Sequence, residues 1–431
     1  MPPKNWAQIN EDGFGYPPCQ GAGDLFTFGG SLFAKVDVGV FRLESLLCLR
    51  WQKVYTPALD CVPLGSHLFS SDYSAGKLWC IAVDQELGNP ANWVQVTSQG
   101  TPGGAHPYPM AEFGGRVYGV LYPDNGGFGI WRSEDAGQPV MTWMKVVDDA
   151  FGDPDNNTAL GFVAVFNGKL YAGTNTLQGV FGAEQFQDGV EVWESPTGDL
   201  GSWKQINVDG FGTEVPSPSG QGPMRVNNVI GSWAVYRPPG QSKDYLFIGT
   251  SSHWGGEVWR YDGSGLGGWM NIQSFVGWGP ARNAAMVSYG GYLYLGEGFP
   301  GGNLARYDGS WQVVEPGPNP FHPDNSGIAA LAVRGPHLFA LTVHKPYSGV
   351  TKGDQVYAYP YYPVPAFVCE PANLFSSLFA QARIRLGPWW TASPVGSAAG
   401  RGRGNGAGAL GGVTDPAASD SDEPAPQTRR R

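Results

Sequence analysis

The sequence predicts an all-β fold in which a unit of four strands is repeated seven times along one chain. Three observations predict it: the composition, a recurring turn-and-strand pattern, and a unit that is divided between the two ends of the chain. The 431 residues include 65 Gly, 36 Pro, 16 Trp, 19 Tyr and 22 Phe, and only 15% are charged. This balance suits many short strands and tight turns better than helices.

A turn that leads into a strand recurs along the chain. In each copy a turn, usually Asn-Gly or Gly-Gly, precedes alternating aromatic and aliphatic residues, which is typical of a hairpin with one buried face. A strand before the turn, a second short strand and a tryptophan-containing strand complete each unit. The clearest copies are FGGRVYGVLY (113–122), FNGKLYAGTN (166–175), KDYLFIGTSS (243–252), YGGYLYLGEG (289–298) and RGPHLFALTV (334–343), and two degenerate units contain FGGSLFAKV and GKLWCIAV.

The last unit lacks its tryptophan strand and ends at Tyr359-Pro360, whereas the chain begins with NWAQINEDGFG, nearly a copy of SWKQINVDGFG (202–212). The missing outer strand is therefore predicted to be the N-terminal segment, whose pairing removes an open sheet edge. The repeat period is about 45 to 65 residues, in the range of propeller repeats. We predict a seven-bladed β-propeller of four-stranded blades over residues 1–364, in which residues 1–15 complete the last blade.

Residues 365–431 depart from this pattern. LFSSLFAQARIRL predicts a short amphipathic helix, and the sequence from Gly396 onward is of low complexity and is predicted to be disordered. The arginines of this extension suit contact with nucleic acid or with an acidic partner, but a solvated tail is the favoured interpretation.

The net charge and the cysteine content exclude some classes of function. A net charge of -10 and a pI near 5.1 argue against nucleic-acid binding by the folded domain, which would need clustered Lys and Arg. The 5 cysteines form no CxxC pair and no metal-ligand spacing with histidine, so free thiols and no cofactor are predicted. No apolar stretch is long enough to span a bilayer, and no signal peptide is apparent at the start. A soluble, cytoplasmic monomer without a membrane partner is expected.

One segment resembles the Asp-box repeat, written S-x-D-x-G-x-T-W. In RSEDAGQPVMTW (132–143), Ser133, Asp135, Gly137 and Trp143 match, with a few residues inserted before Thr142. The resemblance implies a propeller in which the box is a structural turn between the third and fourth strands of a blade. Its carboxylate would accept hydrogen bonds from backbone amides, and its tryptophan would fill the gap between blades. Sialidases with these boxes also carry an Arg-Ile-Pro motif, which this sequence lacks.

Polar residues gather where the innermost strands are predicted to begin. DPDNNTA (153–159), GPMRVNN (222–228), GPARNAA (279–285) and HPDNSGI (322–328) each bring Asn or Arg close to such a strand, and the loops after the second strands add more polar residues to the same face. We therefore predict a ligand site at the mouth of the central funnel. Its residues are Arg225, Arg282, Asn157, Asn228, Asn283, Asn325, Asn175, Trp254, His322 and Tyr122.

This cluster suits a polar or anionic small molecule or a glycan. Arg225 and Arg282 would bind a carboxylate or phosphate in a bidentate manner, and Trp254 would stack on the ligand. A second interpretation stays open, because the asparagines equally suit hydrogen bonds that satisfy crossing-loop backbone amides, and the arginines equally suit ion pairs between blades.

Glu297 is the predicted general acid or base, with His344 or His253 as its partner. The alternative is a partly solvated carboxylate at the rim of the funnel. The histidines belong to different units, and no metal site is predicted.

Three classes of function follow. The first is a binding module for a small polar ligand, which is favoured because the site lacks an obvious nucleophile. The second is a hydrolase or lyase that uses Glu297 and the histidines. The third is a protein-interaction scaffold, whose contact surface would be the proline-rich loops VPSPSGQGP (215–223) and EPGPNPFHPDN (315–325).

Overall fold

The computed structural model separates the chain into one unit, Met1–Cys369, and a second, Glu370–Arg431. All described residues lie in the first unit, and they are 6–16, 23–46, 49–58, 60–72, 75–122, 127–176, 189–216, 223–225, 227–251, 256–275, 283–298, 302–314, 321, 326–343 and 353–360. Strands dominate these residues, so the predicted all-β class is confirmed. Within the same ranges, no helix has the length and apolar character needed to cross a membrane.

Most strands belong to four-stranded antiparallel sheets, in which neighbouring strands follow one another along the chain. The first of these sheets contains β2 (Asp24–Phe28), β3 (Ser31–Val36), β4 (Gly39–Ser45) and β5 (Arg50–Val54), and the second contains β14 (Ala159–Phe166), β15 (Lys169–Asn175), β16 (Val192–Ser195) and β17 (Lys204–Gln205). The third contains β20 (Val229–Tyr236), β21 (Tyr245–Ser251), β22 (Gly256–Tyr261) and β23 (Trp269–Phe275). The fourth contains β24 (Asn283–Tyr289), β25 (Tyr292–Glu297), β26 (Leu304–Tyr307) and β27 (Trp311–Val313). Tight turns join the two innermost strands of most sheets, as between β14 and β15.

Two further groups of four strands are joined into one eight-stranded sheet. The link is a parallel pairing between β9 (Val94–Gln99) and β13 (Val140–Val147), in which Ser98 lies opposite Met141. The first group is β6 (Asp60–Leu64), β7 (His67–Asp72), β8 (Lys77–Ala82) and β9 (Val94–Gln99), and the second is β10 (Tyr108–Phe113), β11 (Arg116–Leu121), β12 (Gly129–Ser133) and β13 (Val140–Val147).

The remaining sheet combines both ends of the folded unit. Strands β28 (Gly327–Arg334), β29 (His337–Val343) and β30 (Gln355–Tyr359) are followed in the sheet by β1 (Ala7–Gln8). Ala7 lies opposite Ala358, and the Ile9 N–H donates to the Val356 carbonyl oxygen at 2.8 Å. The N-terminal strand thus occupies the outer position in the last sheet.

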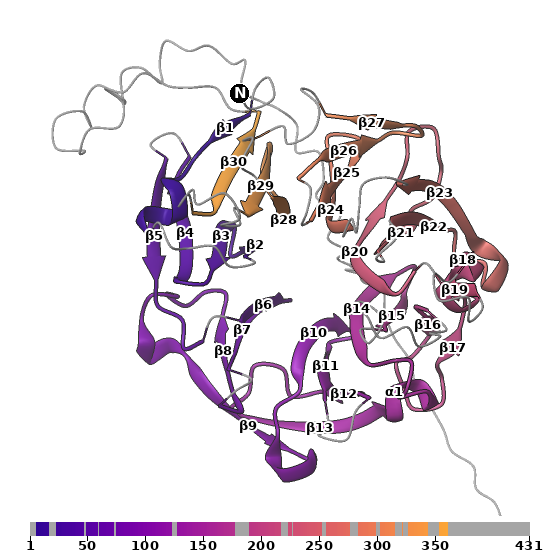
Figure 1. Cartoon of the computed structure of the whole chain (residues 1–431). Coiled ribbons are helices and arrows are strands. Elements are labelled where there is room, and N and C mark those ends of the chain that lie inside the picture. The colour runs from indigo at the N-terminus through magenta and orange to yellow at the C-terminus, as the bar shows by residue number, and fades with distance from the viewer. Residues whose placement is uncertain are drawn as a thin grey trace, which may run out of the picture. The chain divides into compact units, whose positions relative to one another are not determined.

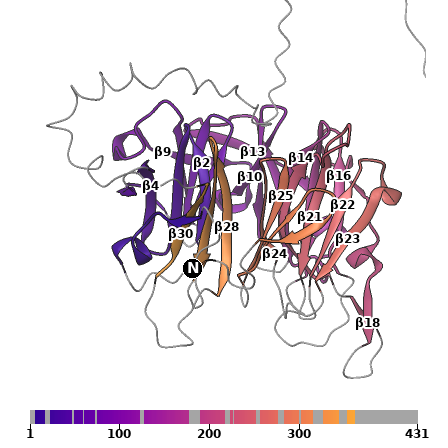
Figure 2. The ribbon, with the colours of Figure 1, turned by 90° about the horizontal axis from the view of Figure 1, so that it is seen from above.

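The sheets of this unit lie side by side around a common centre in a propeller-like arrangement, with strands β2, β6, β10, β14, β20, β24 and β28 innermost (Figure 1). Contacts join β20 to β24, β24 to β28 and β28 to β2, and β2 also contacts β6. A separate two-stranded ribbon, β18 (Glu214–Pro216) with β19 (Pro223–Arg225), follows the outer strand β17. Figure 2 shows β18 projecting beyond the sheets.

Three four-residue turns insert a phenylalanine between neighbouring sheets. They are η1 (Asp12–Gly15), α1 (Asp149–Gly152) and η5 (Asp209–Gly212), and each holds its phenylalanine at a positive φ. The Phe151 ring stacks on Trp193 at 4.5 Å, and the Phe211 ring stacks on Trp259 at 4.4 Å. Each of these rings comes from the segment that follows one sheet and packs on the next sheet. The phenylalanines therefore hold neighbouring sheets together.

The apolar core is divided among the gaps between sheets. In one gap, Phe162 and Tyr171 of one sheet pack with Ile248 and Tyr261 of the next. Stability is therefore distributed over several sheet interfaces, as in other repeat architectures. Cys61 and Cys80 are buried free thiols, in agreement with the predicted thiol state, and burial raises the pKa of Cys61 to about 12.

Candidate functional site

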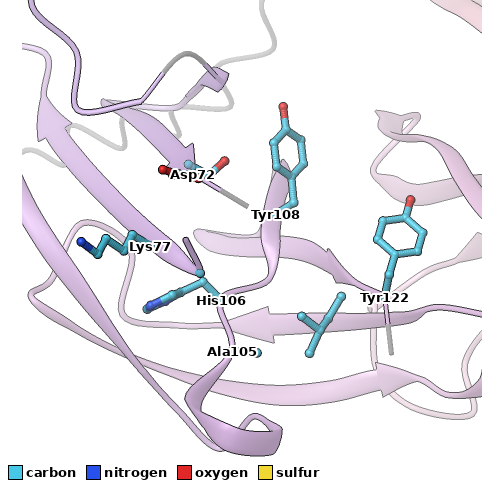
Figure 3. A pocket seen from close by; sticks show the side chains of 9 residues that line it. Asp72, Lys77, Ala105, His106, Tyr108 and Tyr122 are labelled. Atoms are coloured by element: carbon cyan, nitrogen blue, oxygen red, sulfur yellow. The ribbon is translucent and has the colours of Figure 1, made fainter. Parts of the chain in front are cut away.

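A pocket of about 200 Å³ lies between the β7–β8 hairpin and the β10–β11 hairpin. Its lining mixes two phenolic rings with acidic, basic and imidazole groups. Figure 3 shows Tyr108 and Tyr122 extending in one direction, while Lys77 and His106 extend to another side. The lining residues are Ser71, Asp72, Gly76, Lys77, Ala105, His106, Tyr108, Leu121 and Tyr122.

Strand ends position these groups. Asp72 ends β7 and lies opposite Lys77, the first residue of β8. Tyr108 begins the innermost strand β10, and Tyr122 directly follows β11. The pocket therefore lies on the predicted face, where innermost strands begin and second strands end, but it is built by earlier units than those from which most site residues were predicted.

Acidic groups surround the Tyr108 hydroxyl. Burial raises the pKa of Tyr108, and the charges of Asp60 and Asp24 add to this rise. Asp60 is paired with Lys35, whose Nζ lies 2.6 Å from Oδ1 of the carboxylate. Desolvation raises the pKa of Asp24, although Lys35 opposes the shift. Among the described residues, this side of the pocket therefore carries two carboxylates, Asp24 and Asp60, and the cation Lys35.

His106 lies in the segment that leads into β10, and its Nδ1 is 2.7 Å from Ser98 Oγ. Burial lowers the pKa of His106, so the neutral imidazole is favoured near neutral pH. The ring can then donate from one nitrogen and accept at the other.

Of the sequence-predicted residues, Tyr122 lines this pocket. Its hydroxyl oxygen also accepts a hydrogen bond from the Leu160 N–H at 3.3 Å. Tyr122 therefore connects the pocket wall to the start of β14 in the next sheet.

Asn157 lies in a buried network between sheets. It is 0% exposed, and its Nδ2 donates to the Ala150 carbonyl at 3.1 Å and to Glu191 Oε2 at 2.7 Å. The Trp193 Nε1–H donates to the same carboxylate oxygen at 2.9 Å. Burial raises the pKa of Glu191. These partners are protein groups, which agrees with the structural interpretation of this asparagine.

The next sheet repeats this network with Asn227 in place of Asn157. Asn227 Nδ2 donates to the Gly210 carbonyl at 3.0 Å and to Glu257 Oε2 at 2.7 Å, and Trp259 Nε1 donates to Glu257 at 3.0 Å. The residue equivalent to Asn157 is thus Asn227, whereas the sequence prediction named its neighbour Asn228. The motif E-V-W, present at both Glu191 and Glu257, is the sequence signal that could have found these carboxylates.

Asn175 and Asn228 also lie between these two sheets. Asn175 is 9% exposed, and its Oδ1 accepts from the Ile230 N–H at 2.7 Å. Asn228 is 7% exposed, and its backbone carbonyl accepts from the Thr176 N–H at 2.8 Å.

Glu297 ends β25 and is 1% exposed. Its Oε2 accepts hydrogen bonds from the backbone N–H of Asn303 at 3.3 Å and from the Asn303 side-chain amide. Desolvation raises the pKa of Glu297 to about 7, and the hydrogen bonds from Asn303 oppose this shift. A pKa near neutrality suits proton transfer, but the described contacts of the carboxyl are all with its own sheet.

Of the other predicted residues, two have only their backbones described and six lie outside the described residues. Arg225 lies in the β18–β19 ribbon opposite Glu214, and Asn283 begins β24 opposite Glu297, but only their backbones are described. The predicted residues Arg282, Asn325, Trp254, His322, His253 and His344 lie outside the described residues.

Four pocket residues were not predicted from the sequence: Asp72, Lys77, His106 and Tyr108. Asp72 and Lys77 come from a degenerate unit, whereas His106 and Tyr108 begin the unit that contains FGGRVYGVLY. A signal was present, since the segment HPYP (106–109), which leads into β10, resembles HPDN at 322–325. Within the described ranges, no group of three or more His, Cys, Asp or Glu side chains could hold a metal ion.

No protein-family model and no curated protein matches this chain. Solved structures do match: "YCF48 bound to D1 peptide" has a TM-score of 0.45 and 11% identity, covering 85% of this chain and 100% of that one. The dihydro-heme d1 dehydrogenase NirN in complex with DHE has a TM-score of 0.41 and 14% identity, covering 75% and 61%. The Bacteroides ovatus xyloglucan PUL protein GH43B has a TM-score of 0.29 and 15% identity, covering 58% and 51%. Similarity at this level assigns neither a family nor a ligand to this chain.

Proposed function

We propose that this chain is a seven-bladed β-propeller that binds a small polyhydroxylated ligand, such as a sugar unit, in the pocket between β7–β8 and β10–β11. The observation that carries the proposal is the mixed lining of this pocket, in which Asp72, Lys77 and His106 accompany the rings of Tyr108 and Tyr122. Aromatic rings pack against the C–H faces of a sugar, while a few polar groups orient its hydroxyls.

The charge of the surroundings favours a neutral ligand over an anion. Asp24 and Asp60 lie close enough to Tyr108 to affect its pKa, and Asp72 lines the pocket itself. Lys35 offsets Asp60, and Lys77 lies opposite Asp72, so among these described groups Asp24 is left in excess. This negative balance would repel a carboxylate or phosphate ligand. An anion site built on Arg225 and Arg282 remains a separate prediction.

Two structural proposals accompany this function. We propose that the four-strand groups are seven blades of a closed ring, which the pairing of β1 with β30 and the contact of β28 with β2 support. We also propose that the turn at Asp135 is an Asp-box. In support, Asp135 Oδ2 accepts from the Thr142 N–H at 3.0 Å, and Trp143 is 3% exposed.

A ligand screen tests the binding proposal. Thermal shifts of the full chain are measured with glucose, galactose, xylose and N-acetylglucosamine, and with acetate, citrate and inorganic phosphate. We expect a sugar to raise the melting temperature of the wild type. Tyr108→Phe keeps the ring but removes one hydroxyl, and should weaken binding about 5- to 10-fold, as expected for the loss of one hydrogen bond.

The matched control is Tyr16→Phe, which removes a hydroxyl from an exposed tyrosine that does not line the pocket. Its response should equal that of the wild type. A sugar response that survives unchanged in Tyr108→Phe would place the site elsewhere, and a response to anions alone would contradict a polyol site.

A second candidate function, acid–base catalysis by Glu297, is favoured by the burial of this carboxyl at the end of β25, which raises its pKa to about 7. Turnover of any substrate would then fall in Glu297→Gln. The role of this residue in stability is separable from catalysis.

A further inference from the structure

A chain of three polar side chains leads from the protein interior to the pocket. The Trp143 Nε1–H on β13 donates to Ser98 Oγ on β9 at 3.1 Å, and Ser98 Oγ lies 2.7 Å from His106 Nδ1. Trp143 is 3% exposed and Ser98 is 6% exposed, whereas the His106 ring reaches the pocket lining. The first two groups are therefore shielded from water, and the third can meet a ligand.

The parallel pairing of β9 with β13 brings the first two groups together. Thr142 lies opposite Gln99, so Trp143 follows directly where β9 ends. Gly100, which follows Gln99, has φ +84°, and a Cβ at this position would lie 2.3 Å from the Trp143 carbonyl oxygen. Only glycine tolerates both this φ and this approach, so Gly100 maintains the close contact between the strand ends.

The direction of each hydrogen bond follows from the donors and acceptors present. An indole N–H can only donate, so Ser98 Oγ is its acceptor. Oγ has two lone pairs, so the Trp143 bond alone does not set the direction toward His106. The Ser98 hydroxyl proton needs an acceptor, and His106 Nδ1 is the one that the described residues place within hydrogen-bond distance of it. Donation in this direction requires a lone pair on Nδ1. A neutral imidazole with unprotonated Nδ1 has its proton on Nε2, on the opposite edge of the ring.

We propose that Ser98 and Trp143 are positioning residues that fix His106 as an Nε2–H donor, against which the ligand places a hydrogen-bond acceptor oxygen. The ligand class follows from the lining: an oxygen that accepts from His106 or Lys77, together with a hydroxyl that can donate to Asp72. Adjacent hydroxyls of a sugar supply both. The ligand part of this inference rests on the proposed function, whereas the tautomer does not.

The tautomer is tested on the full chain without any ligand. The six histidines are labelled with ¹⁵N, and His106 is assigned from the signals that disappear in His106→Gln. We expect the wild type near pH 7.5 to show an unprotonated Nδ1 and a protonated Nε2. Ser98→Ala should give a mixture of tautomers, and Ser98→Thr, which retains the hydroxyl, should restore the wild-type pattern.

The role of the tryptophan is tested in parallel. Trp143→Phe removes the N–H that orients Ser98 and should shift His106 toward the tautomer mixture. Trp259→Phe removes an equivalent N–H, which donates to Glu257 in another sheet, and should leave the His106 signals unchanged. A protonated Nδ1 in the wild type, or signals identical in wild type and Ser98→Ala, would overturn the inference.

The ligand part is tested by titrating glucose, galactose and N-acetylglucosamine into the same variants. Ser98→Ala should weaken sugar binding about 5- to 10-fold, and Ser98→Thr should bind like the wild type. Equal sugar affinity in Ser98→Ala and wild type would overturn the role of the fixed donor in binding. Absence of any sugar binding with the expected tautomer intact would count against the proposed function alone.

Discussion

Deleting residues 1–15 is expected to leave a chain that no longer folds stably. Trp6 is 5% exposed and stacks on Tyr359 at 5.2 Å, and Ile9 is 0% exposed in the core shared by the first and last sheets. Loss of these two side chains alone removes about 5–10 kcal/mol by large-to-small core values, which is comparable with the whole stability of many domains. The deletion also exposes the edge of β30.

The single substitution Ile9→Ala gives a graded version of this test. We expect it to lower the free energy of unfolding by about 2–5 kcal/mol, measured by urea denaturation monitored by tryptophan fluorescence. A synthetic peptide of residues 1–15 should restore the folded state of the deleted chain, because it carries Ile9 and Phe14, which contact Val356, Phe41 and Trp51 in the rest of the chain.

The matched control is deletion of residues 370–431, which belong to the other compact unit. This truncation should leave the melting temperature of the folded unit unchanged. A chain without residues 1–15 that melts like the wild type would show that the N-terminal strand contributes nothing essential to the fold.

Replacing Glu297 with glutamine is expected to stabilise the protein at alkaline pH. The folded-state pKa of Glu297 is about 7, above its usual value of 4.5, because burial disfavours the charged form. Below pH 4.5 the carboxyl is protonated in both folded and unfolded chains and costs no stability. As the pH rises from 4.5 through about 7, the unfolded chain ionises first, so the folded chain loses up to about 3 kcal/mol.

The measurement is the difference in unfolding free energy between Glu297→Gln and wild type at pH 5 and pH 8. This difference should move in favour of the variant by about 3 kcal/mol over that range. The matched control is Glu86→Gln, the same substitution at an exposed position, which corrects for the removal of one negative charge. The sequence-based alternative of a partly solvated rim carboxylate is wrong, since Glu297 is 1% exposed. A difference that does not change with pH would show that burial does not raise the folded-state pKa of this carboxyl.

Local sequence determined the strands and their grouping. Turn residues such as Gly114 and Gly115, both at positive φ, and the alternation that follows them specify a hairpin from neighbouring residues alone. The near-copy of NWAQINEDGFG at 202–212 likewise indicated an N-terminal outer strand, and β1 pairs with β30. Such features are readable because the interacting residues are close in sequence or repeat at a fixed period.

The partners of the polar side chains were decided only by the tertiary structure. Asn157 and Asn228 looked equivalent in sequence, yet Asn227 is the residue that repeats the contacts of Asn157, because a shift of one residue turns a side chain to a different neighbour. The pocket brings Asp72, His106 and Tyr122 together from three separate segments. Which groups meet there depends on how one sheet packs against the next. The spacing of residues within one segment does not specify that packing.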